Sequence, residues 1–304
     1  MKKTLIALTV AALASTSASA LTVYEQDGNS IAVGGAIKLA LSKETGKKTE
    51  MLKEDAKINV SAKYAISGDA YALGYYEYSF LEKGAVDSGV KKAYVGLGGA
   101  GHQVTFGMQN TIGDSVGEAG FDNLYGVAKS YVDGSGDDLI SYRYTGLQNW
   151  TFGLDYNVKQ GQKGNKKDAA VIGAIYSADG FTGELAYQHK GKVHSFDTAF
   201  SFQADTVKYA LDFGYAKAKG SDANYYVSPG VKVQLDKTGI YGTYTYAKEF
   251  DKDANKFKKS HGVNLGVDYA IAKNTSLFVE GRYTKAKGDD KANKAIGVGM
   301  KVEW

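Results

Sequence analysis

The sequence of 304 residues contains no cysteine and a single proline. Without cysteine the chain forms no disulfide, which excludes the small scaffolds that depend on disulfides for stability. Long hydrophobic runs are also missing. After the first twenty residues the longest is AAVIGAIYSA at 169–178, about half of the roughly 20 residues that a membrane-spanning helix needs. The mean hydropathy is negative, so by hydropathy alone the chain resembles a water-soluble secreted protein.

The first twenty residues have the pattern of a secretory signal peptide. Lys2 and Lys3 form the charged start, residues 5–13 the apolar stretch, and Ala18-Ser19-Ala20 the cleavage site. Cleavage after Ala20 leaves residues 21–304. It removes two of the 37 basic residues, so the mature chain carries a net charge of +2 against its 33 acidic residues. The protein is therefore expected to leave the cytoplasm.

Apolar and polar residues alternate through the rest of the chain, which is the period of a β-strand. In NWTFGLDYNVK, for example, Trp150, Phe152, Leu154, Tyr156 and Val158 alternate with polar residues and glycine. No comparable stretch has sustained helical spacing. The pattern predicts sixteen strands and also admits fourteen or eighteen. The sixteen segments lie near 30–41, 57–66, 70–80, 90–98, 101–109, 137–146, 149–159, 169–178, 181–190, 195–203, 206–216, 224–235, 239–248, 261–270, 275–285 and 294–304.

The connections between these segments alternate in length. Short turns such as SGDA at 67–70 and ADG at 178–180 alternate with longer, lysine-rich connections such as KQGQKGNKKD at 159–168. This asymmetry is typical of an up-and-down membrane barrel, whose short turns face the periplasm. A soluble β-sandwich lacks the asymmetry and uses more proline. The 23 tyrosines, several of them near segment ends, also fit the aromatic girdles of a barrel. The predicted fold is an all-β, sixteen-stranded antiparallel transmembrane barrel.

Motifs of catalysis and cofactor binding have little support. GLGGAG at 96–101 matches the dinucleotide fingerprint, but another strand follows where that motif requires a helix. The four histidines have no metal-ligand spacing, and no G-x-S-x-G nucleophile motif is present. The sequence therefore predicts no enzyme, no cofactor, no metal site and no nucleic-acid partner.

One stretch interrupts the strand pattern. Residues 110–136, NTIGDSVGEAGFDNLYGVAKSYVDGSG, contain no clear strand, and loops of this length are usually functional or disordered. The hydrophobic residues in the stretch fit a solvated linker poorly. They favour a loop folded against the inside of the barrel, from which Asp114, Glu118 and Asp122 would project into the lumen. The alternative is an ordinary surface loop with scattered acids.

Charged residues of the strands can be assigned to a face from the same alternation. A charge on the lipid face costs roughly 2–4 kcal/mol near the midplane. Five charged residues alternate with apolar or aromatic residues and are therefore predicted to face a water-filled lumen: Lys57, Glu77, Arg143, Glu280 and Arg282. Only one of the adjacent Lys91 and Lys92 is expected to face inward, and the alternation does not decide which. Acids on a loop opposite bases on the wall would form a charge-selective constriction.

Several segments give the whole mature chain a resemblance to the trimeric, sixteen-stranded general diffusion porins of Gram-negative bacteria. VYEQDGNSIAVGGAIKLAL at 23–41 resembles the opening of that family, and KKAYVGLGGAGHQVTFGMQNT at 91–111 resembles its fourth and fifth strands. GEAGF at 117–121 lies where the family has its acidic constriction segment. ISYRYTGLQNWTFGLDYN at 140–157 resembles the strand pair after the third external loop, and VGMKVEW at 298–304 the closing strand.

The resemblance implies a pore constriction with two sides. Its acidic residues would be Asp114, Glu118, Asp122 and Glu77, and its basic residues Lys57, Lys91 and Arg143. Three departures weaken the match. Lysine replaces arginine on the wall, which keeps the charge but loses the planar guanidinium geometry. Met108 stands where the family often has a base, and the connection LEKGAVDSG at 81–89, which latches neighbouring subunits in the family, is short.

The expected function is passive diffusion of ions and small hydrophilic solutes through an outer-membrane channel. The protein would be a homotrimer among outer-membrane lipid and lipopolysaccharide, with residues 110–136 limiting the size of solutes. Two alternatives remain. A substrate-selective porin, for example for oligosaccharides, would show an aromatic track along its lumen. A plugged barrel would act as a surface adhesin or structural protein.

The closing segment KAIGVGMKVEW at 294–304 keeps its alternation as far as Trp304. In a closed barrel the last strand pairs with the first, here around 30–41, because no unpaired strand edge is stable in lipid. The resemblance implies that the outer-membrane assembly machinery reads the terminal aromatic residue. The family usually has Phe at this position, whereas this chain has Trp304.

Overall fold

The computed structural model describes residues 20–80, 88–158, 168–251 and 256–304. The predicted signal peptide therefore lies almost entirely outside the described residues. The elements are β1 (Leu21–Gln26), β2 (Asn29–Glu44), β3 (Glu50–Ser67), β4 (Ala70–Ser79), β5 (Gly89–Gly99), β6 (His102–Asn110), the 3-10 helix η1 (Ile112–Ser115), β7 (Ser135–Tyr144), β8 (Trp150–Asn157), β9 (Ala169–Ala178), β10 (Phe181–Lys190), β11 (Val193–Ala204), β12 (Val207–Ala218), β13 (Asn224–Leu235), β14 (Thr238–Asp251), β15 (Lys256–Ala272), β16 (Thr275–Ala286) and β17 (Asn293–Glu303). Among the described residues, no helix is long and apolar enough to cross a membrane.

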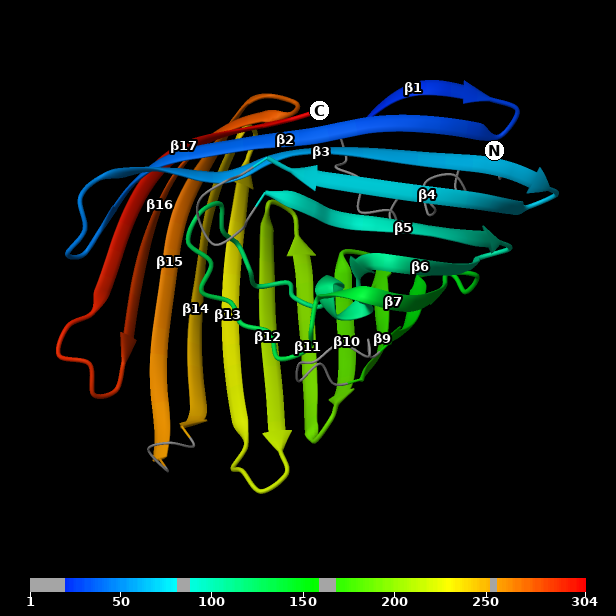
Figure 1. The fold of residues 1–304 in the computed structure, drawn as a ribbon. Helices are drawn as coiled ribbons and strands as arrows, with labels where there is room; N and C mark the ends of the chain where they lie inside the picture. The colour runs from blue at the N-terminus through cyan, green and yellow to red at the C-terminus, as the bar shows by residue number, and fades with distance from the viewer. Residues whose placement is uncertain (1–19, 81–87, 159–167, 252–255) are drawn as a thin grey trace.

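Sixteen of these strands close a barrel (Figure 1). Each strand from β2 to β16 pairs antiparallel with the next one, and β17 pairs back onto β2, from Ala295 opposite Glu44 to Glu303 opposite Ala36. Two more hydrogen bonds extend this seam, because the amide of Gly35 donates to the carbonyl of Trp304 at 2.8 Å and the amide of Trp304 donates back at 3.0 Å. The predicted strand count and the predicted pairing of the first and last segments are confirmed.

A short strand that the alternation did not predict, β1, occupies the rest of the same edge of β2. It pairs with β2 from Leu21 opposite Val33 to Gln26 opposite Asn29. Because β17 and Trp304 pair with residues 35–44 of β2, β1 and β17 lie end to end along one strand. Together they cover β2 over its full length, which leaves no open edge at this point of the barrel.

The two faces of the barrel differ in chemistry as the alternation predicts. On β8 the outward Leu154 is 50% exposed, whereas the next residue, Asp155, is fully buried. The same contrast recurs on β12, where Leu211 is exposed and Asp212 is buried. An exposed apolar face that follows strand after strand is unsuited to water and suited to lipid. The polar side chains on the inner face require a wet interior.

Two-residue turns join strands at one end of the barrel. Asp27 and Gly28 have φ values of 52° and 79°, and Asp179 and Gly180 have values of 51° and 80°. Positive φ at both central residues matches the right-handed twist of the flanking strands and favours the Asp-Gly dipeptide. In outer-membrane barrels the short turns face the periplasm, so the opposite end, with the longer connections, faces outward.

Pro229 lies inside β13, where the sequence predicts a bulge or a strand boundary. That prediction is wrong. The pairing with β12 continues through Pro229 opposite Leu211. The pairing with β14 stops after Val227 opposite Tyr246 and resumes at Gly230 opposite Thr243 without a change of register. The proline interrupts the ladder only on the β14 side, where its missing N–H would have donated.

Candidate pore constriction

The connection between β6 and β7, the third long loop of the barrel, lies inside the ring of strands (Figure 1). It begins with η1 against β8, β9 and β10. Farther along, Asn123 accepts a hydrogen bond from Lys38 of β2 at 2.8 Å, and Lys129 then binds Glu249 of β14 at 2.9 Å. A segment that contacts strands around so much of the circumference, on the face where the polar side chains are buried, must lie within the lumen.

Carboxylates of the wall hold this loop by its backbone. Each of five inward-facing acids, on five different strands, accepts at least one backbone N–H from the loop. The shortest contacts with a normal length are Ile112 to Asp155 at 2.6 Å, Gly117 to Glu184 at 2.8 Å, Glu118 to Asp212 at 2.9 Å, Asn123 to Glu280 at 2.6 Å and Val132 to Asp197 at 2.7 Å. Hydrogen bonds to a charged acceptor are about twice as strong as neutral ones. These five acids, here called the carboxylate clamp, therefore fix the course of the loop.

Only Glu280 of this clamp was assigned to the inner face from the sequence. The same alternation of apolar and polar residues could have assigned the other four acids to the inner face. Asp155, for example, lies between Leu154 and Tyr156, and Asp212 lies between Leu211 and Phe213. A mid-strand acid flanked by lipid-facing side chains has to point inward. The alternation does not reveal that these acids bind a loop.

Apolar packing adds to the clamp where the loop begins. Ile112, Val116 and Val132 form a buried cluster with Val171 of β9 and small residues of β10 and β11. The wall beneath Ile112 is made of glycine, because a Cβ at Gly153 would lie 2.7 Å from the Cβ of Ile112. The hydrophobic residues that argued against a solvated linker therefore form the underside of the loop.

The predicted acids of the loop have different environments. Asp114 and Asp122 are exposed, and each has a lysine of the opposite wall near enough to influence its titration, Lys92 and Lys38 respectively. Glu118 is different, because its carboxylate forms an ion pair with Lys208 of β12 and its side chain is only 13% exposed. Two of the three predicted loop acids, Asp114 and Asp122, thus face the wall of β2 and β5. The third, Glu118, is paired with Lys208 of β12.

The predicted wall residues also separate into two groups. Lys57 lies 3.4 Å from Asp55 and 3.9 Å from Glu77, which places these three side chains together on the inner face of β3 and β4. Arg143 is buried, and its Nη1 donates to Asp155 at 2.8 Å. Arg143 therefore lies behind the start of the loop and supports the clamp.

The adjacent pair Lys91 and Lys92 is resolved by a bulge. Glu77 pairs with Lys92 and Tyr78 pairs with Val90, so Lys91 is the extra residue between them. Lys92 shares the face of Glu77, and its charge acts on Asp114. The register therefore brings Lys92 to the predicted basic side, whereas the sequence prediction named Lys91. The apolar and polar residues of this strand alternate too weakly for a bulge to be recognised from the sequence.

Lys38 is a basic residue of the passage that the sequence prediction missed. It lies on the inner face of β2, and its Nζ donates to the carbonyl of Asn123. Its charge acts on the neighbouring Asp122. The alternation in SIAVGGAIKLAL places residue 38 inward between Ile37 and Leu39, so the signal was present in the sequence.

The titration of the two loop acids follows from their surroundings. Asp114 is exposed to the lumen, but the protein around it displaces part of its hydration, which raises its pKa, whereas Lys92 and Asn110 lower it. The protein around Asp122 raises the pKa of its carboxyl to about 6, with a further rise from Glu280 and an opposing effect of Lys38. A carboxyl with this pKa loses its charge within the range of mildly acidic media.

We expect the charge selectivity of the passage to depend on pH between 7 and 5. Asp122 is ionised above its pKa of about 6 and neutral below it, so acidification removes a negative charge from the passage. The ratio of cation to anion permeability should fall, as measured by the reversal potential in a salt gradient. In Asp122→Asn the ratio should already be low at pH 7 and should change less on acidification. An identical reversal potential of the wild type at pH 7 and pH 5 would contradict the assignment.

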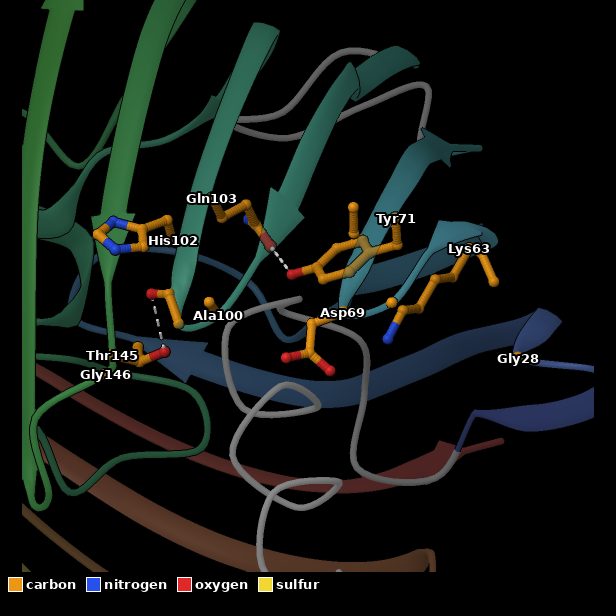
Figure 2. A pocket seen from close by; sticks show the side chains of 13 residues that line it. Gly28, Lys63, Asp69, Tyr71, Ala100, His102, Gln103, Thr145 and Gly146 are labelled. Carbon is orange, nitrogen blue, oxygen red and sulfur yellow. Dashed lines mark hydrogen bonds between the residues drawn. The ribbon is translucent and has the colours of Figure 1, made fainter.

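A cavity of about 530 Å³ lies at the periplasmic rim of the barrel, among the short turns that follow β1, β3, β5 and β7 (Figure 2). The ammonium group of Lys63 lies 4.2 Å from the ring centre of Tyr71, whose hydroxyl donates to Gln103 at 3.3 Å. The cavity is therefore polar, and one basic residue, Lys63, and one acidic residue, Asp69, both line it.

Comparison with known proteins gives concordant results. The family model described as Gram-negative porin matches residues 7–289. The "Major outer membrane protein" of Pasteurella multocida is 29% identical, over the full length of both chains. Among solved structures, a loop deletion mutant of OmpT of Vibrio cholerae has a TM-score of 0.79 at 16% identity and covers 91% of this chain and 100% of its own. OmpF of Salmonella typhi has a TM-score of 0.78 at 16% identity, with coverage of 93% and 100%.

Proposed function

Because the chain belongs to the Gram-negative porin family and is an outer-membrane diffusion channel, we propose that solutes cross it between the third loop and the inner wall of β2–β5. The observation that carries this proposal is the placement of charges across the passage. Asp114 and Asp122 of the clamped loop lie within electrostatic range of Lys92 and Lys38, and Lys57 and Glu77 extend the charged wall. Opposed charges across a narrow, wet passage select among ions and polar solutes.

The direct test of this function is single-channel recording in a planar bilayer. The purified mature barrel should produce stable conducting steps whose size increases with salt concentration. Absence of such steps would refute the diffusion channel. Saturable block of the current by one sugar would convert the proposal to a substrate-selective channel.

Charge substitutions in the passage should move the reversal potential in opposite directions. The double variant Asp114→Asn/Asp122→Asn should favour anions several-fold over the wild type, because it removes the negative side of the passage. The variant Lys38→Gln/Lys92→Gln should favour cations. Asp268→Asn is a single-charge control, since this inner-face acid binds Lys232 on β13 at 3.2 Å and, among the described residues, has no hydrogen bond or ion pair to the third loop. Equal shifts in all three variants would show that the passage runs elsewhere.

A channel specialised for sugars is less well supported. Such a channel needs aromatic rings that present their faces to the solute. Four inward tyrosines of the strands, Tyr71, Tyr75, Tyr226 and Tyr241, are each at most 9% exposed, and the ring of inward-facing Tyr94 stacks on Tyr75. These rings therefore pack within the wall. We therefore propose a channel without a preferred sugar, and we propose no catalysed reaction and no cofactor.

The assembly of the protein also belongs to this proposal. A solved structure of OmpT of Vibrio cholerae is described as a trimer form, which supports a homotrimer here. The short second connection that puts subunit latching in doubt lies almost entirely outside the described residues. Electrophoresis of unheated samples, with cross-linking as a check, distinguishes a trimer from a monomer. Removal of residues 1–20 on export and recognition of Trp304 by the assembly machinery remain predictions.

A further inference from the structure

Two histidines face each other across the hairpin of β10 and β11. His189 lies directly opposite His194, and their rings stack with centroids 4.7 Å apart and planes inclined by 12°. Both side chains are exposed on the outer face of the barrel, in line with the lipid-facing Leu185 and Tyr187. Their spacing of five residues along the chain does not indicate a metal site, because only the register of the hairpin brings them together.

The hairpin fixes the position of this pair. Only Gly191 and Lys192 join the two strands, and this is the shortest connection at the end opposite the periplasmic turns. All ten residues of β10 pair with β11 without a shift of register. The backbone positions of the two histidines are therefore set before any ligand binds, which reduces the entropy that binding costs.

The ring nitrogens of the pair are available to a ligand. Nδ1 of His194 lies 2.6 Å from the hydroxyl of Tyr187. In the tautomer that carries its proton on Nδ1, this nitrogen donates to the hydroxyl oxygen and Nε2 carries the lone pair. Among the described residues, the ring of His189 stacks on that of His194 and has no hydrogen-bond partner. A ring held through one nitrogen and open at the other is typical of metal-binding histidines.

The other two histidines of the sequence lack a second imidazole. His102 and His261 also lie on the outer face, and each has its Nδ1 within hydrogen-bond distance of a tyrosine hydroxyl, at 2.8 and 2.7 Å. Each is surrounded by tyrosine rings. A histidine beside a tyrosine therefore recurs on this barrel, whereas two histidines side by side occur only on β10 and β11.

We propose that His189 and His194 together bind a divalent transition-metal ion, with Cu²⁺ bound more tightly than Ni²⁺ or Zn²⁺. Imidazole suits these ions, and affinity rises to Cu²⁺ along the first-row series. Metal–nitrogen bonds of about 2.0–2.1 Å place two ligand nitrogens about 3 Å apart. The stacked rings reach this separation by turning about their Cβ–Cγ bonds. The described residues contain no group of three or more metal-ligating side chains, so water completes the coordination.

One neighbouring charge opposes the site. Lys217 of β12 lies directly opposite His194 on the side away from His189, and its positive charge repels a cation. Lys217 is exposed, so water and salt screen much of this repulsion. On the other flank, Ala170 of β9 lies opposite His189 and carries no charge. We therefore expect an ion that exchanges with the medium rather than one that is held permanently.

The test compares two double variants of the full mature barrel, prepared without a histidine tag. H189Q/H194Q removes the pair, and the matched control H102Q/H261Q removes the same number of outward-facing histidines elsewhere. Isothermal titration calorimetry in detergent measures the binding of Cu²⁺, Ni²⁺ and Zn²⁺, with Ca²⁺ as an ion that prefers oxygen ligands. Electron paramagnetic resonance of the Cu²⁺ complex counts the nitrogens bound to the metal.

We expect H102Q/H261Q to bind Cu²⁺ within about twofold of the wild type and H189Q/H194Q to bind it at least about tenfold more weakly, because the latter loses both protein ligands. The spectrum of the wild type should show two imidazole nitrogens. Equal Cu²⁺ affinity of the two double variants, a single bound nitrogen in the wild type, or Ca²⁺ binding as tight as that of Cu²⁺ would overturn the proposal.

A single variant keeps the test valid if H189Q/H194Q does not fold, as judged by the mobility of unheated samples in electrophoresis. H189Q leaves the bond between Tyr187 and His194 in place, and it should also bind Cu²⁺ more weakly than H102Q/H261Q does. Affinity equal to that of the control would overturn the proposal. Single-channel recording of the same preparations is independent of this site. A wild type that binds Cu²⁺ but conducts no ions would refute the channel and leave the metal site intact.

Discussion

Deletion of Trp304 should reduce the folded barrel in the outer membrane severely while leaving export unchanged. The deletion removes both hydrogen bonds between Trp304 and Gly35, at 2.8 and 3.0 Å. At about 1 kcal/mol each, these bonds correspond to roughly thirtyfold in the equilibrium of seam closure. It also uncovers Gly35, over which the indole lies. Outer-membrane fractions are compared by the mobility of heated and unheated samples, with the periplasmic fraction as the measure of export.

Two variants separate the role of Trp304 as a strand residue from its role as a side chain. Trp304→Phe keeps both backbone hydrogen bonds and an aromatic ring, so it should assemble at close to the normal level. Gly35→Ala keeps Trp304 but should impair assembly, because the new Cβ would lie 2.4 Å from an atom of the indole ring. Normal amounts of folded barrel after the deletion would show that the seam closes without this residue.

Replacement of Glu280 by alanine should free the middle of the third loop and change the channel most strongly. The Glu280 carboxylate accepts the backbone N–H groups of Asn123, Leu124 and Tyr125, and also the Tyr241 hydroxyl. Each donor left without a partner costs about 1–3 kcal/mol unless water reaches it. We expect a noisier open state, a larger mean conductance and faster entry of larger solutes, measured by single-channel recording and liposome swelling.

Two controls accompany this prediction. One keeps a hydrogen-bond acceptor at position 280, and the other removes the same negative charge at a different place on the inner face. Glu280→Gln retains one carbonyl oxygen and should behave between the wild type and Glu280→Ala. Asp268→Ala removes another inner-face acid, one that binds Lys232, and should leave the open-state noise unchanged. If Glu280→Ala conducts as quietly as the wild type, the other members of the carboxylate clamp hold the loop without it.

The strands and the directions of their side chains were predictable because lipid enforces a period of two. That rule assigned Lys57, Glu77 and Arg143 to the inner face. It did not predict that Arg143 would bind Asp155, because nothing local links one inner-face residue to a partner on the next strand. Glu118 was expected to project into the lumen with the other loop acids, but a loop has no period from which its ion pair with Lys208 of β12 could have been predicted.

Two features of the structure were not predicted from the sequence, and the reason can be identified for each. The register choice between Lys91 and Lys92 depends on a bulge opposite Glu77 and Tyr78, and a bulge is decided by pairing across strands. The strand β1 is only six residues long and alternates weakly. Its turn, Asp27-Gly28, is nevertheless the dipeptide that most favours a two-residue hairpin, and this signal would have revealed it.

The seam between β17 and β2 has a consequence for the timing of folding. It joins residues 35–44 to residues 295–304, so the first long strand remains without its second neighbour until almost the whole sequence has been synthesised and exported. A ribosome-bound or still-translocating chain therefore cannot complete the ring, and its strand edges stay open to aggregation. Premature termination anywhere before the last strand yields a chain that cannot seal, which makes ring closure a check on the completeness of synthesis.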